Sequence, residues 1–294
     1  QTSWFQTEAY GPWAKDIERA TDGRVRVSFT TASVGAANRQ LDLVKSGIVD
    51  AAMGAHGYTP GVFPLSGVAE LPFLSKNGER LGAAMWQVHQ KYPAFLEEYR
   101  GTKVLNVWGH TGVILLQRSE DPITAVDQFK GMKIRVAAPA MADIVTKLGG
   151  APVNQPASST YELLARGVVD GALWTYDAWD SFKLQGVVKS ATIVPGHFGN
   201  GTVYTVVNAD SWRKISKKDQ DAIMACCAGV SSSATMGAVW DRVGARVKDK
   251  MLKAGVKFHT LSAAETAKLH QQLQFIQDAW VKQANAKGLD GKAI

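Results

Sequence analysis

Apolar and polar residues follow two periodicities along the chain, which together predict a mixture of strands and helices. Short apolar blocks or every-second-residue alternation are typical of strands, whereas apolar residues three or four apart are typical of helices. The predicted strands cover residues 24–29, 49–53, 103–108, 113–117, 132–136, 169–173, 204–207 and 257–259. The predicted helices cover residues 10–20, 77–99, 141–148, 217–253 and 262–286, with another beginning near 209.

Two segments of the chain resemble each other. Leu43–Met53 and Leu163–Leu173 each contain a helix end, a glycine and an apolar strand, and each follows an earlier predicted strand. A strand, a helix and a second strand in this order form a βαβ unit, which implies a parallel sheet. The repeat predicts two similar α/β domains, and chance similarity between α/β units is the alternative.

Three helical segments carry further signals. Pro93 marks a possible break in the helix over 77–99. The segment 217–253 has no proline and would be roughly 55 Å long as one helix, enough to brace both halves of the molecule. Its three glycines, of which Gly229 is the first, make a kink or break the alternative. Ser262 and Glu265 form a capping-box pattern at the start of the last helix.

Composition narrows the class of protein. The chain has 294 residues, of which 46% are hydrophobic and 20% charged, as in a globular protein with room for two domains. It has no run of 18 apolar residues, and it does not begin with a signal-peptide pattern, so we expect a mature form. The net charge of +7 comes from scattered residues, which argues against nucleic-acid binding.

The only two cysteines, Cys226 and Cys227, are neighbours in a helical stretch. Neighbouring side chains on a helix point in different directions, so we expect two buried free thiols. A disulfide between them is the alternative. Neither reading supplies a metal site.

Arg135 carries the strongest functional signal because it lies inside a short apolar strand. A buried guanidinium needs an anionic partner, and its planar fork matches a carboxylate. The partner can be a ligand, and a structural salt bridge is the alternative. Known nucleotide-binding, zinc and nucleophile motifs are absent from the sequence, so we expect no catalytic residue, cofactor or metal. The loops after predicted strands instead hold polar and aromatic residues typical of a ligand cleft, namely His56, Tyr58, His110, Trp174, Tyr176, Phe198 and Asn200.

Several motifs, in order, resemble those of the extracytoplasmic solute-binding subunits of tripartite ATP-independent periplasmic (TRAP) transporters, the DctP-like family. They are Thr21–Val25, Leu41–Asp50, Glu70–Leu74, Phe129–Arg135 and Tyr161–Gly171. The resemblance covers nearly the whole chain. It implies an α/β fold of two domains, with a ligand cleft between them and a long bridging helix. The domains would comprise 1–112 plus 200–239 and 113–199 plus 240–294.

The resemblance also implies a function and a set of contacts. Arg135 matches the family arginine that pairs with the ligand carboxylate, and Trp174 matches a ligand-contact position. A tryptophan there resembles the binders of keto acids and aromatic acids. The candidate ligand contacts are Arg135, Trp174, His56, Tyr176, His110, Phe198, Asn200, Ala137 and Phe5.

We therefore expect a monomeric periplasmic receptor that captures a small organic acid and delivers it to the TRAP membrane permease subunits. An aromatic or 2-keto acid is the favoured ligand. The alternatives are an enzyme that uses His56 and His110 as acid and base, and a sensor module that feeds a signalling protein.

Overall fold

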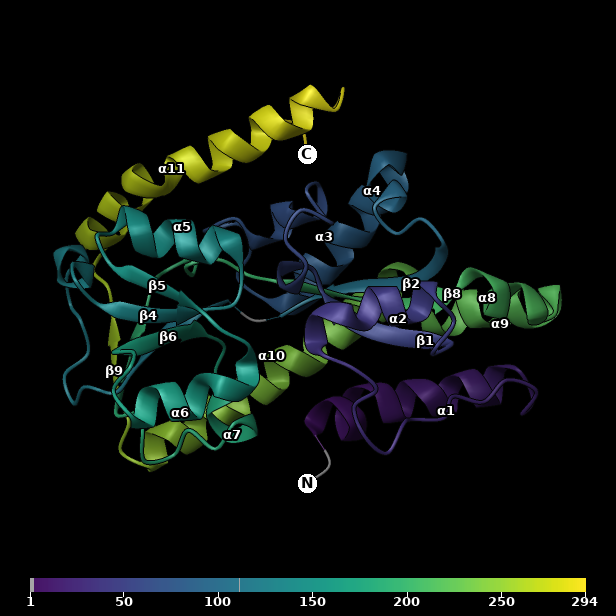
Figure 1. Ribbon diagram of the computed structural model, residues 1–294, viewed down its shortest axis with the longest axis horizontal. Coiled ribbons are helices and arrows are strands. Elements are labelled where there is room, and N and C mark those ends of the chain that lie inside the picture. The colour runs from purple at the N-terminus through teal and green to yellow at the C-terminus, as the bar shows by residue number, and fades with distance from the viewer. Residues whose placement is uncertain (1–2, 111) are drawn as a thin grey trace. The chain divides into compact units, whose positions relative to one another are not determined.

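The computed structural model describes residues 3–110 and 112–294, and the chain divides into two compact units. Unit 1 comprises Gln1–Ser66, Asn77–His110 and Thr202–Trp240. Unit 2 comprises Gly67–Lys76, Thr111–Gly201 and Asp241–Ile294. Each unit has its own sheet with helices packed on it (Figure 1), so the mixed α/β fold class is confirmed. The predicted domain I also includes residues 1, 2 and 111, which lie outside the described residues.

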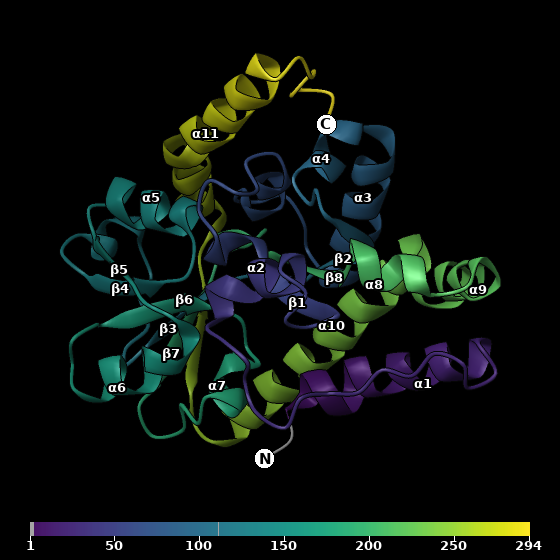
Figure 2. The same ribbon diagram turned by 45° about the vertical axis from the view of Figure 1, so that its right-hand side comes forward.

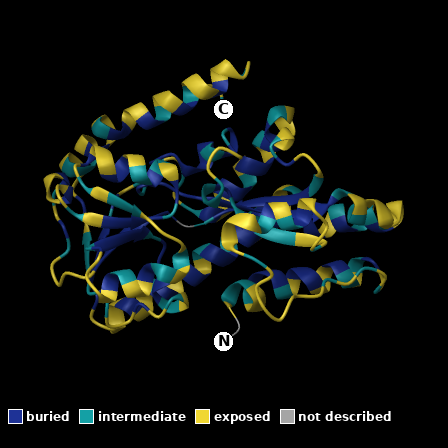
Figure 3. Cartoon of the chain, in the orientation of Figure 1, coloured by how far each residue is buried: buried dark blue, intermediate teal, exposed yellow. Residues whose placement is uncertain are grey.

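Unit 1 is built on an antiparallel sheet with the strand order β1-β8-β2. Every residue of β8 is buried, as expected for a central strand (Figure 3). The strands are β1 (Ala51–Ala55), β2 (Thr102–Gly109) and β8 (Thr202–Asn208). The helices are α1 (Gly11–Ala20), α2 (Gln40–Lys45), α3 (Gly78–Lys91), α4 (Pro93–Glu97), α8 (Ala209–Lys214), α9 (Lys217–Cys227) and the first half of α10 (Gly229–Lys253). A π-helical turn, Phe5–Tyr10, leads directly into α1.

The predicted strand over 24–29 is wrong. These residues do alternate, with Val25 and Val27 half-buried and Arg26 and Ser28 exposed. A strand also needs a hydrogen-bonded neighbour, and this segment has no ladder partner within the described ranges. Among the described residues, unit 1 therefore has no parallel pair, and its predicted βαβ unit is incomplete.

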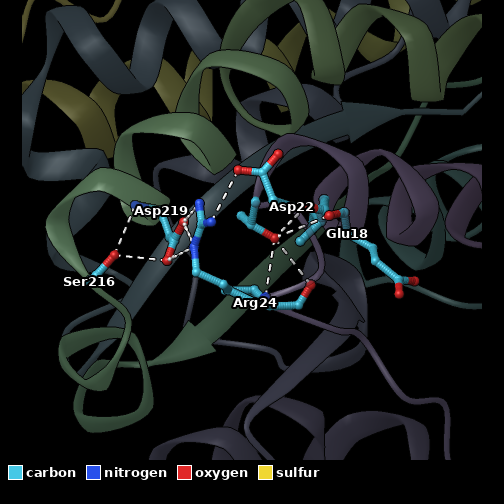
Figure 4. A network of polar contacts seen from close by, with 8 residues as sticks. Glu18, Asp22, Arg24, Ser216 and Asp219 are labelled. Atoms are coloured by element: carbon cyan, nitrogen blue, oxygen red, sulfur yellow. Dashed lines mark hydrogen bonds and ion pairs between the residues drawn. The ribbon is translucent and has the colours of Figure 1, made fainter.

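Arg24, in the same segment, joins α1 to α9 (Figure 4). Its Nε and Nη2 donate to Asp219 Oδ1 over 3.0 and 2.8 Å, and Nη1 donates to Asp22 over 3.0 Å. Ser216, the N-cap of α9, donates its hydroxyl to the same Asp219 carboxylate. The Arg24 guanidinium holds the pKa of Asp219 below its usual range. The Thr21–Val25 motif thus has a structural role in unit 1.

Two predicted helices are interrupted where the sequence allowed it. Tyr92 is extended between α3 and α4, so the break before Pro93 is confirmed. The segment 217–253 is also broken, with a bend of 45° between α9 and α10 at Gly229, where φ is +79°. No single helix in the described ranges is long and apolar enough to cross a membrane, and only this bent pair passes that test, by length and composition.

The prediction of two buried free thiols is wrong, because Cys226 and Cys227 form a disulfide and Cys226 is exposed. The expectation assumed an uninterrupted helix. In fact α9 ends at Cys227, and Ala228 is extended, so the pair lies where the helical backbone stops.

Unit 2 has a six-stranded mixed sheet with the order β5-β4-β6-β3-β7-β9. Strand β4 is parallel to β5 and β6, whereas β3 is antiparallel to its neighbours β6 and β7. The strands are β3 (Ile114–Gln117), β4 (Lys133–Val136), β5 (Ala151–Asn154), β6 (Gly171–Trp174), β7 (Ser190–Ile193) and β9 (Lys257–Thr260). The helices are α5 (Pro139–Lys147), α6 (Thr160–Ala165), α7 (Ala178–Ser181), the second half of α10 and α11 (Ala263–Ala286). Helix α5 lies on one face of this sheet and α6 on the other (Figure 2).

Capping at the start of α11 follows half of the predicted pattern. The Ser262 hydroxyl accepts a hydrogen bond from Glu265 N over 3.2 Å, as the capping box requires. The Glu265 carboxylate accepts instead from Val126 N over 2.7 Å and so ties α11 to the loop before β4.

The internal repeat has the same backbone in both copies. Gly47 and Gly167 follow their helices with φ of +70° and +68°. In each copy the next amide returns to the carbonyl five residues earlier, Ile48 to Leu43 over 3.0 Å and the corresponding valine to Leu163 over 2.9 Å. Only glycine adopts this turn without strain, which explains its place in both segments.

The segment 67–76 is separated in sequence from the rest of unit 2 but packs on it. Phe73 stacks on His270 of α11 at 3.7 Å, and Gln277 of the same helix donates to Pro72 O. Gly199 lies against Glu70, and a Cβ there would come within 2.7 Å of Glu70 O. The Glu70 side chain is 7% exposed, and burial raises its pKa from the ordinary 4.5 to about 7.

Candidate functional site

Arg135 is fully buried in β4, as the sequence predicted for its strand. It pairs with Val153 on one neighbouring strand and Ala172 on the other. Its Nε donates to the carbonyl of Gln155, just beyond β5, over 3.0 Å. This bond fixes the inner end of the guanidinium group. Arginine keeps its charge at any ordinary pH, so unit 2 holds a permanent cation in its interior.

Trp174 lies beside that cation. It follows Ala172 by two residues on β6 and therefore projects from the same face of the sheet as the position paired with Arg135. The guanidinium carbon lies 4.4 Å from the centre of the Trp174 ring, which is within the range of a cation–π interaction. Trp174 is half-buried.

Phe182 is a neighbour of Trp174 that the sequence did not reveal. The two ring centres lie 4.6 Å apart at an interplanar angle of 37°. Phe182 follows α7, a helix of four residues that has no clear apolar periodicity in the sequence. Arg135, Trp174 and Phe182 form a continuous row of contacts, which we call the ring stack.

The other predicted residues of unit 2 differ in environment. Ala137 directly follows β4 and is half-buried. Tyr176 is buried, and its ring lies 5.6 Å from Lys248 Nζ and 6.3 Å from the Phe258 ring. Burial raises the pKa of Tyr176 from the ordinary 10 to about 12, and the phenol is protonated near neutral pH at either value. Its hydroxyl can therefore act as a hydrogen-bond donor.

Phe198 and Asn200 both lie in the buried end of the unit 2 segment that precedes β8. Phe198 is fully buried and packs edge-on against Phe129 at 5.5 Å, as a core residue does. Asn200 is 1% exposed. Phe198 is therefore a core residue of unit 2 and not a member of the ring stack.

In unit 1, His56 belongs to a buried chain of hydrogen bonds. Its Nδ1 lies 2.8 Å from Thr202 Oγ1, and its Nε2 contacts the hydroxyl of Tyr99. That hydroxyl lies 3.3 Å from His89 Nε2, which is also 3.2 Å from Ser66 Oγ. Both ring nitrogens of His56 therefore already have protein partners.

Burial determines the charge of the two histidines in this hydrogen-bond network. It lowers the pKa of His56 to about 3 and that of His89 to about 4, so both rings are neutral near pH 7. The Glu98 carboxylate accepts from the amides of Leu65 and Ser66 over 2.6 and 3.0 Å and also from Ser66 Oγ over 2.7 Å. This network of hydrogen bonds thus fixes the backbone at Leu65 and Ser66, just before the segment 67–76.

The remaining two predicted residues, Phe5 and His110, are brought together by Trp240. The Trp240 ring lies 4.9 Å from Phe5 and 5.1 Å from His110. Trp4 and Trp108 extend the group, with centres 5.3 and 5.4 Å from Trp240. The sequence did not point to these three tryptophans. They come from three separate segments of unit 1, and no local helix or strand pattern shows that these segments meet.

The chemistry of both groups is that of binding. The ring stack offers a fixed cation and an aromatic face, and the unit 1 group offers rings. Across the described ranges, no group of three or more His, Cys, Asp or Glu residues could hold a metal ion.

Comparison with known proteins agrees with this chemistry. The sequence model of the DctP family, described as bacterial extracellular solute-binding protein, family 7, matches residues 2–283. A TRAP periplasmic solute-binding protein from Bordetella bronchiseptica, solved with bound (R)- and (S)-mandelate, is 30% identical. The alignment has a TM-score of 0.94 and covers 99% of this chain and 92% of that one.

Two further relatives are similar over almost the whole chain. A marine metagenome TRAP solute-binding protein specific for aromatic acid ligands, solved with metahydroxyphenylacetate, is 27% identical with a TM-score of 0.88, covering 97% of this chain and 89% of that one. The outer membrane transporter protein TsaT of Comamonas testosteroni is 27% identical over 96% of this chain and 82% of its own length.

Proposed function

Because the chain belongs to family 7 of the bacterial extracellular solute-binding proteins, whose members are receptors of TRAP transporters, we propose that it captures a small aromatic carboxylic acid. The observation that carries the proposal is the Arg135 guanidinium, held at Nε by Gln155 O and lying 4.4 Å from the Trp174 ring. The acid's carboxylate binds the guanidinium, and its ring packs beside Trp174.

Two relatives support this ligand class. The Bordetella structure holds mandelate, and the metagenome structure holds metahydroxyphenylacetate, and both ligands combine one carboxylate with one phenyl ring. Tyr176 and Ala137 are the further ligand contacts that we propose in unit 2. In unit 1 we propose Phe5 and His110.

Transport follows from the same proposal. The receptor acts in the periplasm as a monomer and delivers its acid to the TRAP permease subunits. The two compact units support the predicted division into domains, except that residues 67–76, which were predicted in domain I, cluster with unit 2. We propose no catalytic step, because the ring nitrogens of His56 contact Thr202 and Tyr99 and the ring is neutral near pH 7.

Calorimetric titration of the purified protein with a panel of acids tests the proposal. We expect micromolar or tighter binding of mandelate, benzoate or a hydroxybenzoate, and much weaker binding of succinate and glucuronate. A protein that binds only the dicarboxylate or the sugar acid would contradict the aromatic ligand class. Consumption of the bound acid, followed by NMR, would favour the enzyme alternative.

A further inference from the structure

Phe182 is the last member of the ring stack. It lies eight positions after Trp174 in the sequence, and the intervening turn and α7 bring the two rings together. Trp174 is the last residue of β6, so the strand holds its backbone on the N-terminal side only. Phe182 is half-buried, and its ring centre lies 4.6 Å from that of Trp174. Aromatic pairs at this separation attract each other beyond their shared buried area.

The backbone that carries Phe182 is held by several bonds within unit 2. Phe182 N donates to Ala178 O, and Leu184 N donates to Trp179 O, both over 2.9 Å. Asp180 of α7 forms an ion pair with Lys250 of α10. The Phe182 ring is therefore presented to Trp174 from a fixed turn.

We propose that Phe182 is a positioning residue that gives the receptor its preference for aromatic acids. This inference rests on the proposed function. Phe182 holds the Trp174 ring in contact with the Arg135 guanidinium, so that a carboxylate on the guanidinium places its own ring beside that of Trp174. Without Phe182 the Trp174 ring gains rotational freedom, and a flat ligand ring loses a preorganised face.

The test compares mandelate with hexahydromandelate, which keeps the carboxylate and hydroxyl but replaces phenyl with cyclohexyl. Kd for both acids is measured for the wild type, Phe182→Ala, Phe182→Leu and Phe182→Tyr. Phe275→Ala is the matched control, because Phe275 is an exposed phenylalanine on α11. We expect the preference for mandelate to fall about tenfold in the Ala and Leu variants, and to be retained in Phe182→Tyr and in the control.

A merely structural role would weaken both acids in parallel and leave their ratio unchanged, and that result would overturn the inference. The Leu variant keeps most of the side-chain volume, so it provides the ratio even where the Ala variant unfolds. A wild type that binds neither acid refutes the proposed function and this inference with it. A wild type that prefers mandelate, with variants of the same preference, refutes the inference alone.

Discussion

Single residues in unit 2 combine charge with burial in two opposite ways. Arg135 is a permanent cation, fully buried, and its environment supplies a carbonyl at Nε and the face of Trp174. Glu70 is a buried acid whose pKa is raised to about 7 by desolvation. Near neutral pH its carboxyl group is therefore protonated in a large fraction of the molecules. The first arrangement suits an anionic ligand, and the second makes the folded state sensitive to pH.

Replacing Arg135 with alanine or lysine tests the ligand site directly. We expect Arg135→Ala to weaken mandelate binding about 100-fold or more, because the carboxylate loses its charged partner in a buried site. Lysine should recover only part of this loss, since it lacks the planar fork. The measurement is calorimetric Kd. Arg166→Ala, an exposed arginine paired with Glu162 in the same unit, is the control and should bind normally.

Glu70→Gln should change stability in a pH-dependent way. The folded-state pKa lies above the ordinary 4.5, so wild-type stability falls as pH rises from about 4.5 to about 7. Glutamine resembles the protonated acid. We expect the variant to be more stable than the wild type by up to about 3 kcal/mol at pH 8, with little difference at pH 4. Urea unfolding at both values checks this, and a difference independent of pH would contradict it. The exposed Glu120→Gln is the control.

At the scale of elements, helix ends explain much of the architecture. Ser262 caps α11 and Ser216 caps α9, each by accepting an amide three residues on. Gly47 and Gly167 end α2 and α6 with the same left-handed turn. These local signals are visible in the sequence, which is why the helices and the repeat were predictable.

Removing the α11 cap gives a prediction at this scale. Ser262→Ala leaves the amide of Glu265 without its side-chain acceptor and should lower the free energy of unfolding by about 1 kcal/mol. Chemical denaturation followed by circular dichroism measures the change. Ser231→Ala, at an exposed position inside α10, should be neutral or slightly stabilising. Equal effects of the two substitutions would argue against the cap.

Features that depend on distant partners were not predictable in the same way. The alternation of residues 24–29 is real, but whether an extended segment becomes a strand depends on a neighbour that no local pattern reveals. Arg135 and Trp174 could be chosen because each is distinctive for its position, a cation inside an apolar strand and a tryptophan where a strand ends. Phe182 and Trp240 could not, because an aromatic residue in or beside a helix is usually part of a core.

At the scale of the whole molecule, the buried histidine chain in unit 1 predicts instability in acid. The pKa values of His56 and His89 are lowered to about 3 and about 4, so this contribution to stability is complete above about pH 6.5 and is lost as pH falls towards these values. Each histidine should cost roughly 1.4 kcal/mol per pH unit within that range.

Urea unfolding between pH 7 and 4 measures this slope. His89→Gln should flatten it by about one proton, whatever the variant does to stability at pH 7. Gln271→Ala, at an exposed position of α11, is the comparison and should leave the slope as it is, because it removes no ionisable group. A wild-type curve that is flat over the whole range would contradict the assignment of neutral buried rings.

The grouping of Trp4, Trp108 and Trp240 in unit 1 has a practical consequence for spectroscopy. These are three of the nine tryptophans in the chain. The ring centres of Trp4 and Trp108 lie 5.3 and 5.4 Å from that of Trp240. At such separations excitation passes readily between neighbouring indoles, so the emission of these three tryptophans is shared and does not report on any one of them. A fluorescence titration intended to report on Trp174 therefore requires variants in which these three emitters, as well as the five other tryptophans, have been replaced by phenylalanine.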